Sequence, residues 1–242
     1  MRIDLRVDPL PERLISCERS MTYVESLTQA TDSISETSSD DRRLAGTFFV
    51  VLAAQFMTVI MLGAAMAPGY DFGGGAISDL GVVGTTALMF NASLVAVGVL
   101  NLLGGYFFYR AHGKRWLLAV FALAGLGAVG AGAFPLDHPT GLHGLFALLA
   151  FVFFNVEAIG SATELAGPMR VFSVLAGVVG FVFVVLMALG DAGNTAFFGP
   201  FGHGGTERMI VYPAMLWLVA AGGYLMGGGN DSGRSVDGTS AE

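Results

Sequence analysis

The chain has 242 residues, of which 54% are hydrophobic and only 13% are charged, and its formal net charge is -7. A soluble domain carries about 25% charged residues, so this composition excludes a protein that faces water on every side. An acidic chain without a basic patch also argues against nucleic acid as a partner.

The balance of charged residues is unusual, because Lys114 is the only lysine beside eleven arginines. Acidic, lysine-poor chains are typical of halophilic archaeal proteins, whose negative surfaces stay soluble in high salt. The single cysteine, Cys17, excludes a disulfide bond within the chain.

The two ends of the chain are polar. Residues 1–43 contain no apolar run of spanning length and are rich in Ser, Thr, Asp and Glu. Such a segment buries too little apolar surface to offset its ordering entropy, which predicts a disordered acidic tail within which Met21 is an alternative start. Residues 227–242 are rich in Gly, Ser and Asp and predict a second flexible tail.

Between the tails, apolar runs recur at about the 20 residues needed to cross a hydrocarbon core. They predict an all-α, polytopic membrane bundle of six transmembrane helices in one domain, residues 44–226. A short interfacial helical turn is expected over residues 78–84, and Ala124, Ala128 and Gly132 form a small-residue packing face. The expected spans are 44–67, 85–109, 116–134, 143–161, 171–190 and 209–226.

Basic residues near the spans predict the orientation in the membrane. Of the 12 Lys and Arg residues, all except Arg208 fall on one side of the expected bundle. Cytoplasmic loops carry this excess of positive charge, so we expect a multi-pass protein of the plasma membrane with both termini in the cytoplasm.

With this topology, the connections on the outer side collect titratable side chains. Three of the 4 histidines lie there, and imidazole is a common zinc ligand. We take His138, His143 and His203 as candidate metal ligands, with Asp79 or Glu207 as the catalytic group that would activate a zinc-bound water. Candidate substrate-binding residues are Ser78, Asn91, Asp137 and Glu157.

The same residues have a simpler structural interpretation. Asp137 or His138 could cap the fourth helix, and Ser78 or Asp79 could cap the second helical piece. Acids near a helix N-terminus are also favoured by the helix dipole, which would explain Glu207 after a capping Thr206.

Glu157 stands inside an expected span. An acid at a helix centre costs about 2.5–3.5 kcal/mol on insertion scales, so it is a functional candidate unless it is protonated or paired with Asn101 or Gln55. Asn91 and Asn155, like Gln55 and Asn101, are expected to hydrogen-bond between helices.

The motif Ala76-Ile77-Ser78-Asp79-Leu80-Gly81, together with Phe90-Asn91 and Asp137-His138-Pro139…His143, carries a family resemblance. The chain resembles the domain of unknown function 998 family of bacterial and archaeal membrane proteins. The resemblance covers about residues 44–226 and implies a fold of about six spans without implying an activity.

Together these patterns predict a membrane protein whose outward-facing polar pocket binds a lipid head group or small solute. A zinc-dependent, membrane-embedded hydrolase is the first alternative, using the three histidines and an acid. A proton-linked transporter that uses Glu157 is the second.

Overall fold

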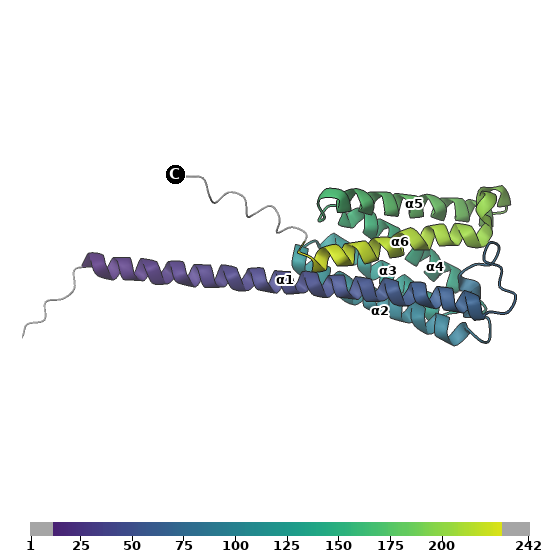
Figure 1. Cartoon of the computed structure of the whole chain (residues 1–242), viewed down its shortest axis with the longest axis horizontal. Helices are drawn as coiled ribbons and strands as arrows, with labels where there is room; N and C mark the ends of the chain where they lie inside the picture. The colour runs from purple at the N-terminus through teal and green to yellow at the C-terminus, as the bar shows by residue number, and fades with distance from the viewer. Residues whose placement is uncertain (1–11, 229–242) are drawn as a thin grey trace, which may run out of the picture. The chain divides into compact units, whose positions relative to one another are not determined.

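The computed structural model describes residues 12–228, which contain helices and no strand. The all-α class is therefore confirmed for this part of the chain (Figure 1). The α-helices are α1 (Glu12–Met66), α2 (Ala87–His112), α3 (Arg115–Ala133), α4 (His143–Ser161), α5 (Gly167–Asp191) and α6 (Gly202–Met226), with short 3-10 helices η1 (Ser78–Gly81) and η2 (Thr195–Phe201).

The chain divides into two units, residues 1–40 and 41–242. Helix α1 begins at Glu12, so the expectation of disorder over residues 1–43 differs from the structure wherever the structure describes this segment. Residues 12–40 contain neither Gly nor Pro, the two residues that most disfavour a helix interior. The first eleven residues and the expected tail beyond residue 228 lie outside the described residues.

Six helices are long and apolar enough to cross a membrane, as predicted. The fourth span has the expected bounds, His143–Ser161. The sixth helix begins earlier than expected, because α6 starts at Gly202 and Glu207 lies in its second turn rather than in its first. The expected helical turn after the first span is η1.

Small residues let the helices pack closely. Gly98 of α2 and Gly125 of α3 meet backbone to backbone, leaving no room for a Cβ atom at Gly98. Ala124, Ala128 and Gly132 are buried on α3, which confirms the predicted packing face. Close approach of this kind is the usual basis of helix association in lipid, where the hydrophobic effect does not drive helices together.

Aromatic side chains fill the centre of the bundle. The rings of Phe49 and Phe121 stack at 5.4 Å between centroids, and Trp217 lies beside Phe49 at 6.3 Å. The indole N–H of Trp217 donates to the Ser173 hydroxyl at 2.7 Å. The buried indole therefore has the polar partner that it needs in an apolar interior.

The connections at residues 67–86, 134–142 and 192–201 gather at one end of the bundle, which we call the loop end (Figure 1). Two glycine-rich stretches meet there: the backbone N–H of Gly205 donates to the Gly73 carbonyl at 3.1 Å. A Cβ atom at Gly202 would lie 2.8 Å from the same carbonyl oxygen. Glycine thus lets the first connection lie directly against the start of α6.

The opposite end carries the basic residues, and we call it the basic end. Arg110 pairs with Asp41 at 3.1 Å, and Lys114 pairs with Glu164 at 3.6 Å. Arg170 donates from Nε to the carbonyl of Leu165 at 3.0 Å. The uneven distribution of basic residues, from which the orientation is predicted, is therefore present in the folded bundle as well as in the sequence.

Candidate functional site

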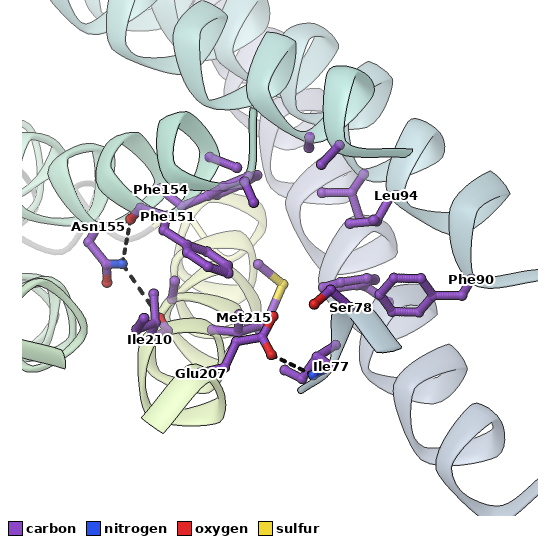
Figure 2. A pocket seen from close by; sticks show the side chains of 18 of the residues that line it. Ile77, Ser78, Phe90, Leu94, Phe151, Phe154, Asn155, Glu207, Ile210 and Met215 are labelled. Carbon is purple, nitrogen blue, oxygen red and sulfur yellow. Dashed lines mark hydrogen bonds between the residues drawn. The ribbon is translucent and has the colours of Figure 1, made fainter. Parts of the chain in front are cut away.

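Two cavities lie at the loop end, with volumes of about 320 Å³ and about 60 Å³. The larger is bordered by α4, α5 and α6, and the smaller lies deeper among apolar side chains; Figure 2 shows the smaller one. The cavities share six lining residues: Ser78, His143, Ala147, Phe151, Glu207 and Ile210. We call these six residues the shared wall.

Glu207 attaches η1 to α6. Its Oε2 accepts a hydrogen bond from the backbone N–H of Ile77 at 2.5 Å (Figure 2), and the backbone of Ser78 also hydrogen-bonds to this carboxylate. The side chain is 4% exposed. These N–H groups belong to Ile77, the N-cap residue of η1, and to Ser78, its first residue. Such N–H groups have no partner within the helix, so the acid acts as a cap supplied by another helix.

Two further side chains hold the same turn. Asp79 accepts the backbone N–H of Ala76 through Oδ2 at 2.8 Å, and Asn91 donates from Nδ2 to the Gly81 carbonyl at 2.8 Å. Gly81 packs so closely on Asn91 that a Cβ atom there would lie 2.7 Å from Oδ1. The turn is therefore fixed in place beside the cavities.

His143 begins α4 and caps the end of α3. Its Nδ1 lies 3.1 Å from the carbonyl oxygen of Ala131 and 3.0 Å from that of Phe134. Carbonyl oxygens only accept hydrogen bonds, so Nδ1 carries the hydrogen. The ring is thereby fixed with its other nitrogen, Nε2, free of any hydrogen bond to the described residues. His143 is only 5% exposed and lines both cavities.

The Ser78 hydroxyl is the second polar group of the shared wall that has no hydrogen-bond partner among the described residues. Ser78 lines both cavities, and its backbone is held by Glu207. A hydroxyl both donates and accepts, whereas the free nitrogen of a neutral imidazole accepts. The Ser78 hydroxyl and Nε2 of His143 together therefore offer one donor and two acceptors to a molecule that enters the cavities.

Asp191 and His203 stand where the larger cavity meets the surface. The Nε2 of His203 lies 3.2 Å from Oδ1 of Asp191, and both residues line the larger cavity. The pair joins the last residue of α5 to the second residue of α6. With Glu207 deeper inside, the polar part of this cavity is acidic.

Arg208 is the one basic residue that lies apart from the others in the sequence pattern, and its contacts explain its position. Its guanidinium donates to the carbonyls of Gly75 at 3.1 Å and Gly204 at 2.8 Å, and to the Tyr70 hydroxyl at 2.6 Å. It also lies 4.1 Å from the ring centroid of Phe72. Burial raises the pKa of Tyr70 above its ordinary value, although the Arg208 hydrogen bond opposes this shift.

The candidate zinc ligands do not come together. Of the three histidines, His143 and His203 line the larger cavity, but His143 uses Nδ1 to cap α3 and His203 pairs with Asp191. His138 instead contacts Thr140 at 2.9 Å in the 134–142 connection. Within the described residues, no group of three or more His, Cys, Asp or Glu side chains could hold a metal ion.

The other candidates divide in the same way. Glu207 and Ser78 lie in the shared wall, while Asp79 and Asn91 support it from behind without lining either cavity. Asp137 is exposed in its connection. No side-chain cap is found on α4, so the expected capping by Asp137 or His138 is wrong. The Thr206 hydroxyl donates to the Gly202 carbonyl one turn earlier and caps nothing.

The expected interhelical hydrogen bonds of the amides are largely confirmed. Gln55 of α1 accepts from the Ser93 hydroxyl of α2 at 2.8 Å, and Asn101 of α2 donates to Glu157 of α4 at 3.1 Å. Asn155 donates mainly within its own helix, to Phe151 at 2.8 Å, with a longer bond of 3.5 Å to Ile210 (Figure 2). Glu157 thus lies away from both cavities, paired as anticipated.

The apolar walls of the site were not foreseen. Ala147 and Phe151 of α4, Val184 of α5 and Ile210 of α6 line the larger cavity. Each occurs inside a long apolar run, where sequence alone does not distinguish a cavity wall from a lipid-facing or packed position. The one available signal is the small size of Ala147, which leaves space one turn after His143.

These features define an all-helical, multi-pass membrane protein in which the first connection is hydrogen-bonded to the start of α6 beside a partly polar cavity. The family model described as Protein of unknown function (DUF998) matches residues 50–224. The chain belongs to this family, as the resemblance indicated. Comparisons with curated proteins and with solved structures find no match.

Proposed function

We propose that the larger cavity binds the polar head of an amphiphile whose head group carries hydrogen-bond donors. The observation that carries the proposal is the arrangement of His143: Nδ1–H is used on α3, and Nε2 remains as an acceptor at a cavity that already holds the Ser78 hydroxyl. Nε2 makes no hydrogen bond to the described residues, so a donor on a bound molecule would meet an acceptor that is already fixed in orientation.

The composition of the cavity favours an amphiphile over a fully polar solute. Its polar groups stand at one end, and the remainder is lined by apolar side chains of α4, α5 and α6. Leu148 on this wall is 47% exposed, and an exposed apolar side chain within a span faces lipid. An acyl chain could therefore leave the cavity toward the bilayer while the head stays at the shared wall.

The charge of the cavity favours an ammonium head. Glu207 and Asp191 are acids, no Lys or Arg lines this cavity among the described residues, and the free histidine nitrogen accepts. An ammonium group supplies several donors and a positive charge. The proposed ligand class is thus a lipid or lysolipid with a primary amine.

The test compares lysophosphatidylethanolamine with lysophosphatidylcholine of the same chain length, which differ in whether the head amine carries N–H donors. Native mass spectrometry of the purified protein should retain the ethanolamine lipid and release the choline lipid at lower collision energy. In Ala147→Trp, the indole should occupy the cavity space beside the shared wall, and this preference should disappear. The matched control Ala65→Trp, at an exposed position of α1, should keep it.

Equal retention of the two lipids by the wild-type protein would contradict the proposed head-group chemistry. A preference that survives in Ala147→Trp would place the binding elsewhere. A loss of the preference in Ala65→Trp as well would show that bulk on the lipid-facing surface, rather than the cavity, is responsible.

A further inference from the structure

A second polar site lies inside the bundle, apart from the cavities. Glu157 of α4 and Asn101 of α2 are both 0% exposed, and Asn101 donates from Nδ2 to Oε2 of Glu157 at 3.1 Å. Neither residue lines either cavity. A carboxyl group in this position needs a reason, because an isolated buried charge is strongly disfavoured.

The hydrogen bonds of this pair are incomplete if Glu157 is ionised. The Nδ2 of Asn101 also donates to the Phe121 carbonyl at 3.0 Å, so both of its hydrogens are used. Oε1 of Glu157 and Oδ1 of Asn101 have no partner among the described residues. Both atoms are acceptors when the acid is charged, and a buried acceptor without a hydrogen bond destabilises the folded state.

No basic side chain compensates Glu157. Four titratable groups of the basic end have other partners: Arg110 pairs with Asp41, Lys114 with Glu164, Arg170 with the Ala162 and Leu165 carbonyls, and His112 with the Phe108 carbonyl. The remaining arginines of this end, Arg42, Arg43 and Arg115, form no ion pair with Glu157. Within the described part of the chain, the only polar side chain hydrogen-bonded to Glu157 is the neutral amide of Asn101. A charged Glu157 would therefore be both buried and unpaired.

We propose that Glu157 is a proton-binding site: it is held as a neutral carboxylic acid that forms a two-hydrogen-bond pair with the Asn101 amide. A proton on Oε1 becomes a donor to Oδ1 of Asn101, while Oε2 continues to accept from Nδ2. One bound proton thus gives both unpartnered oxygens a hydrogen bond and removes the charge. The site is independent of the ligand proposed for the larger cavity.

The pairing links protonation to a helix contact. The acid and the amide come from α4 and α2, so the proton supplies a hydrogen bond between these helices. Release of the proton would leave a carboxylate in a dry interior, and the ionised state is accessible only if water reaches the contact between α2 and α4. Proton release and opening of this contact must therefore occur together.

Infrared spectroscopy tests the proton directly. The difference spectrum of wild type minus Glu157→Gln at neutral pH should show the C=O band of a protonated carboxylic acid. The matched control, wild type minus Glu164→Gln, removes the acid that pairs with Lys114 and should show carboxylate bands instead. Carboxylate bands in the Glu157→Gln difference would overturn the proposal.

Stability provides the second test. Glutamine has the shape of a neutral glutamic acid and can make both hydrogen bonds to Asn101, so Glu157→Gln should unfold at the wild-type temperature across neutral and mildly acidic pH. Glu157→Leu makes this position apolar and leaves the Asn101 amide without its hydrogen-bond partner. This variant should therefore unfold at a clearly lower temperature. A Glu157→Gln protein that fails to fold, or is as unstable as Glu157→Leu, would contradict the acid–amide pair.

Discussion

Glu207 of α6 accepts a hydrogen bond from the backbone N–H of Ile77 at 2.5 Å, although 130 positions separate the two residues in the chain. This bond fixes the connection after the first span to the last span. It also sets the position of Ser78, whose hydroxyl lines the cavities. The acid that the helix-dipole interpretation placed with its own helix therefore supports a turn that is distant in the sequence.

Replacing Glu207 with Gln should destabilise the protein by about 1–3 kcal/mol, the usual cost of leaving a buried hydrogen-bonding group unsatisfied. The amide offers one acceptor oxygen and turns an NH2 group toward the backbone donors of η1. Thermal unfolding in detergent measures the effect. Glu164→Gln, which breaks a pair near the surface, should cost no more than about 1 kcal/mol. Equal effects of the two variants would contradict the capping role of Glu207.

Arg208 and Tyr70 should be energetically coupled. The guanidinium donates to the Tyr70 hydroxyl, which itself donates to the Ala76 carbonyl at 2.7 Å. Residues within one hydrogen-bond network show coupling energies of about 0.5–3 kcal/mol in double-mutant cycles. We expect a value in this range for Arg208→Lys with Tyr70→Phe, measured by unfolding. Additive effects would mean that the network does not act as a unit.

Close packing of α2 against α3 should make Gly98 intolerant of a side chain. Its Cβ atom would collide with the Gly125 backbone, so Gly98→Ala must push the helices apart and should lower the unfolding temperature. Gly223 of α6 has no atom within 4 Å of such a Cβ position. Gly223→Ala should leave the protein unchanged or stabilise it by up to about 1 kcal/mol, because Ala favours helix. The reverse order would contradict the described packing.

The loop end should face the outside of the cell, because the basic end carries the positive charge that marks cytoplasmic connections. In a Cys17→Ser background, Ala192→Cys should react with a membrane-impermeant maleimide added to intact cells. Arg115→Cys should react only after the cells are opened. Ala192 and Arg115 are both exposed, so burial does not complicate the comparison. Labelling of both from the same side would refute the predicted orientation.

Much of the architecture could be predicted because lipid imposes it. A run of about 20 apolar residues has few alternatives to a spanning helix, so the bounds of α4 follow directly from the sequence. The start of α1 at Glu12 was not predicted, because a pattern of apolar runs does not detect a polar helix; residues 12–40 contain neither Gly nor Pro, the residues that most disfavour a helix interior.

The site could be predicted only in part. Clustering of polar residues at one end predicted that Asp79, His138, His143, His203 and Glu207 share a region; of these, His143, His203 and Glu207 line the larger cavity, whereas Asp79 and His138 do not. The sequence could not show that His143 directs Nδ1 to α3, because this depends on where the carbonyls of Ala131 and Phe134 lie after folding. That geometry occupies Nδ1 of His143 with two carbonyls at the end of α3 and leaves Nε2 at the cavities, while the metal-ligand role of His143 stays a prediction.

The most direct test of the binding proposal is the nitrogen-15 NMR spectrum of the histidine side chains, since the chain contains only 4 histidines. His143→Asn assigns the resonances. We predict that Nδ1 of His143 carries the hydrogen and is insensitive to ligand, whereas the Nε2 resonance shifts on saturation with lysophosphatidylethanolamine. An Nε2 resonance that does not move, or a hydrogen on Nε2 in place of Nδ1, would contradict the proposed site.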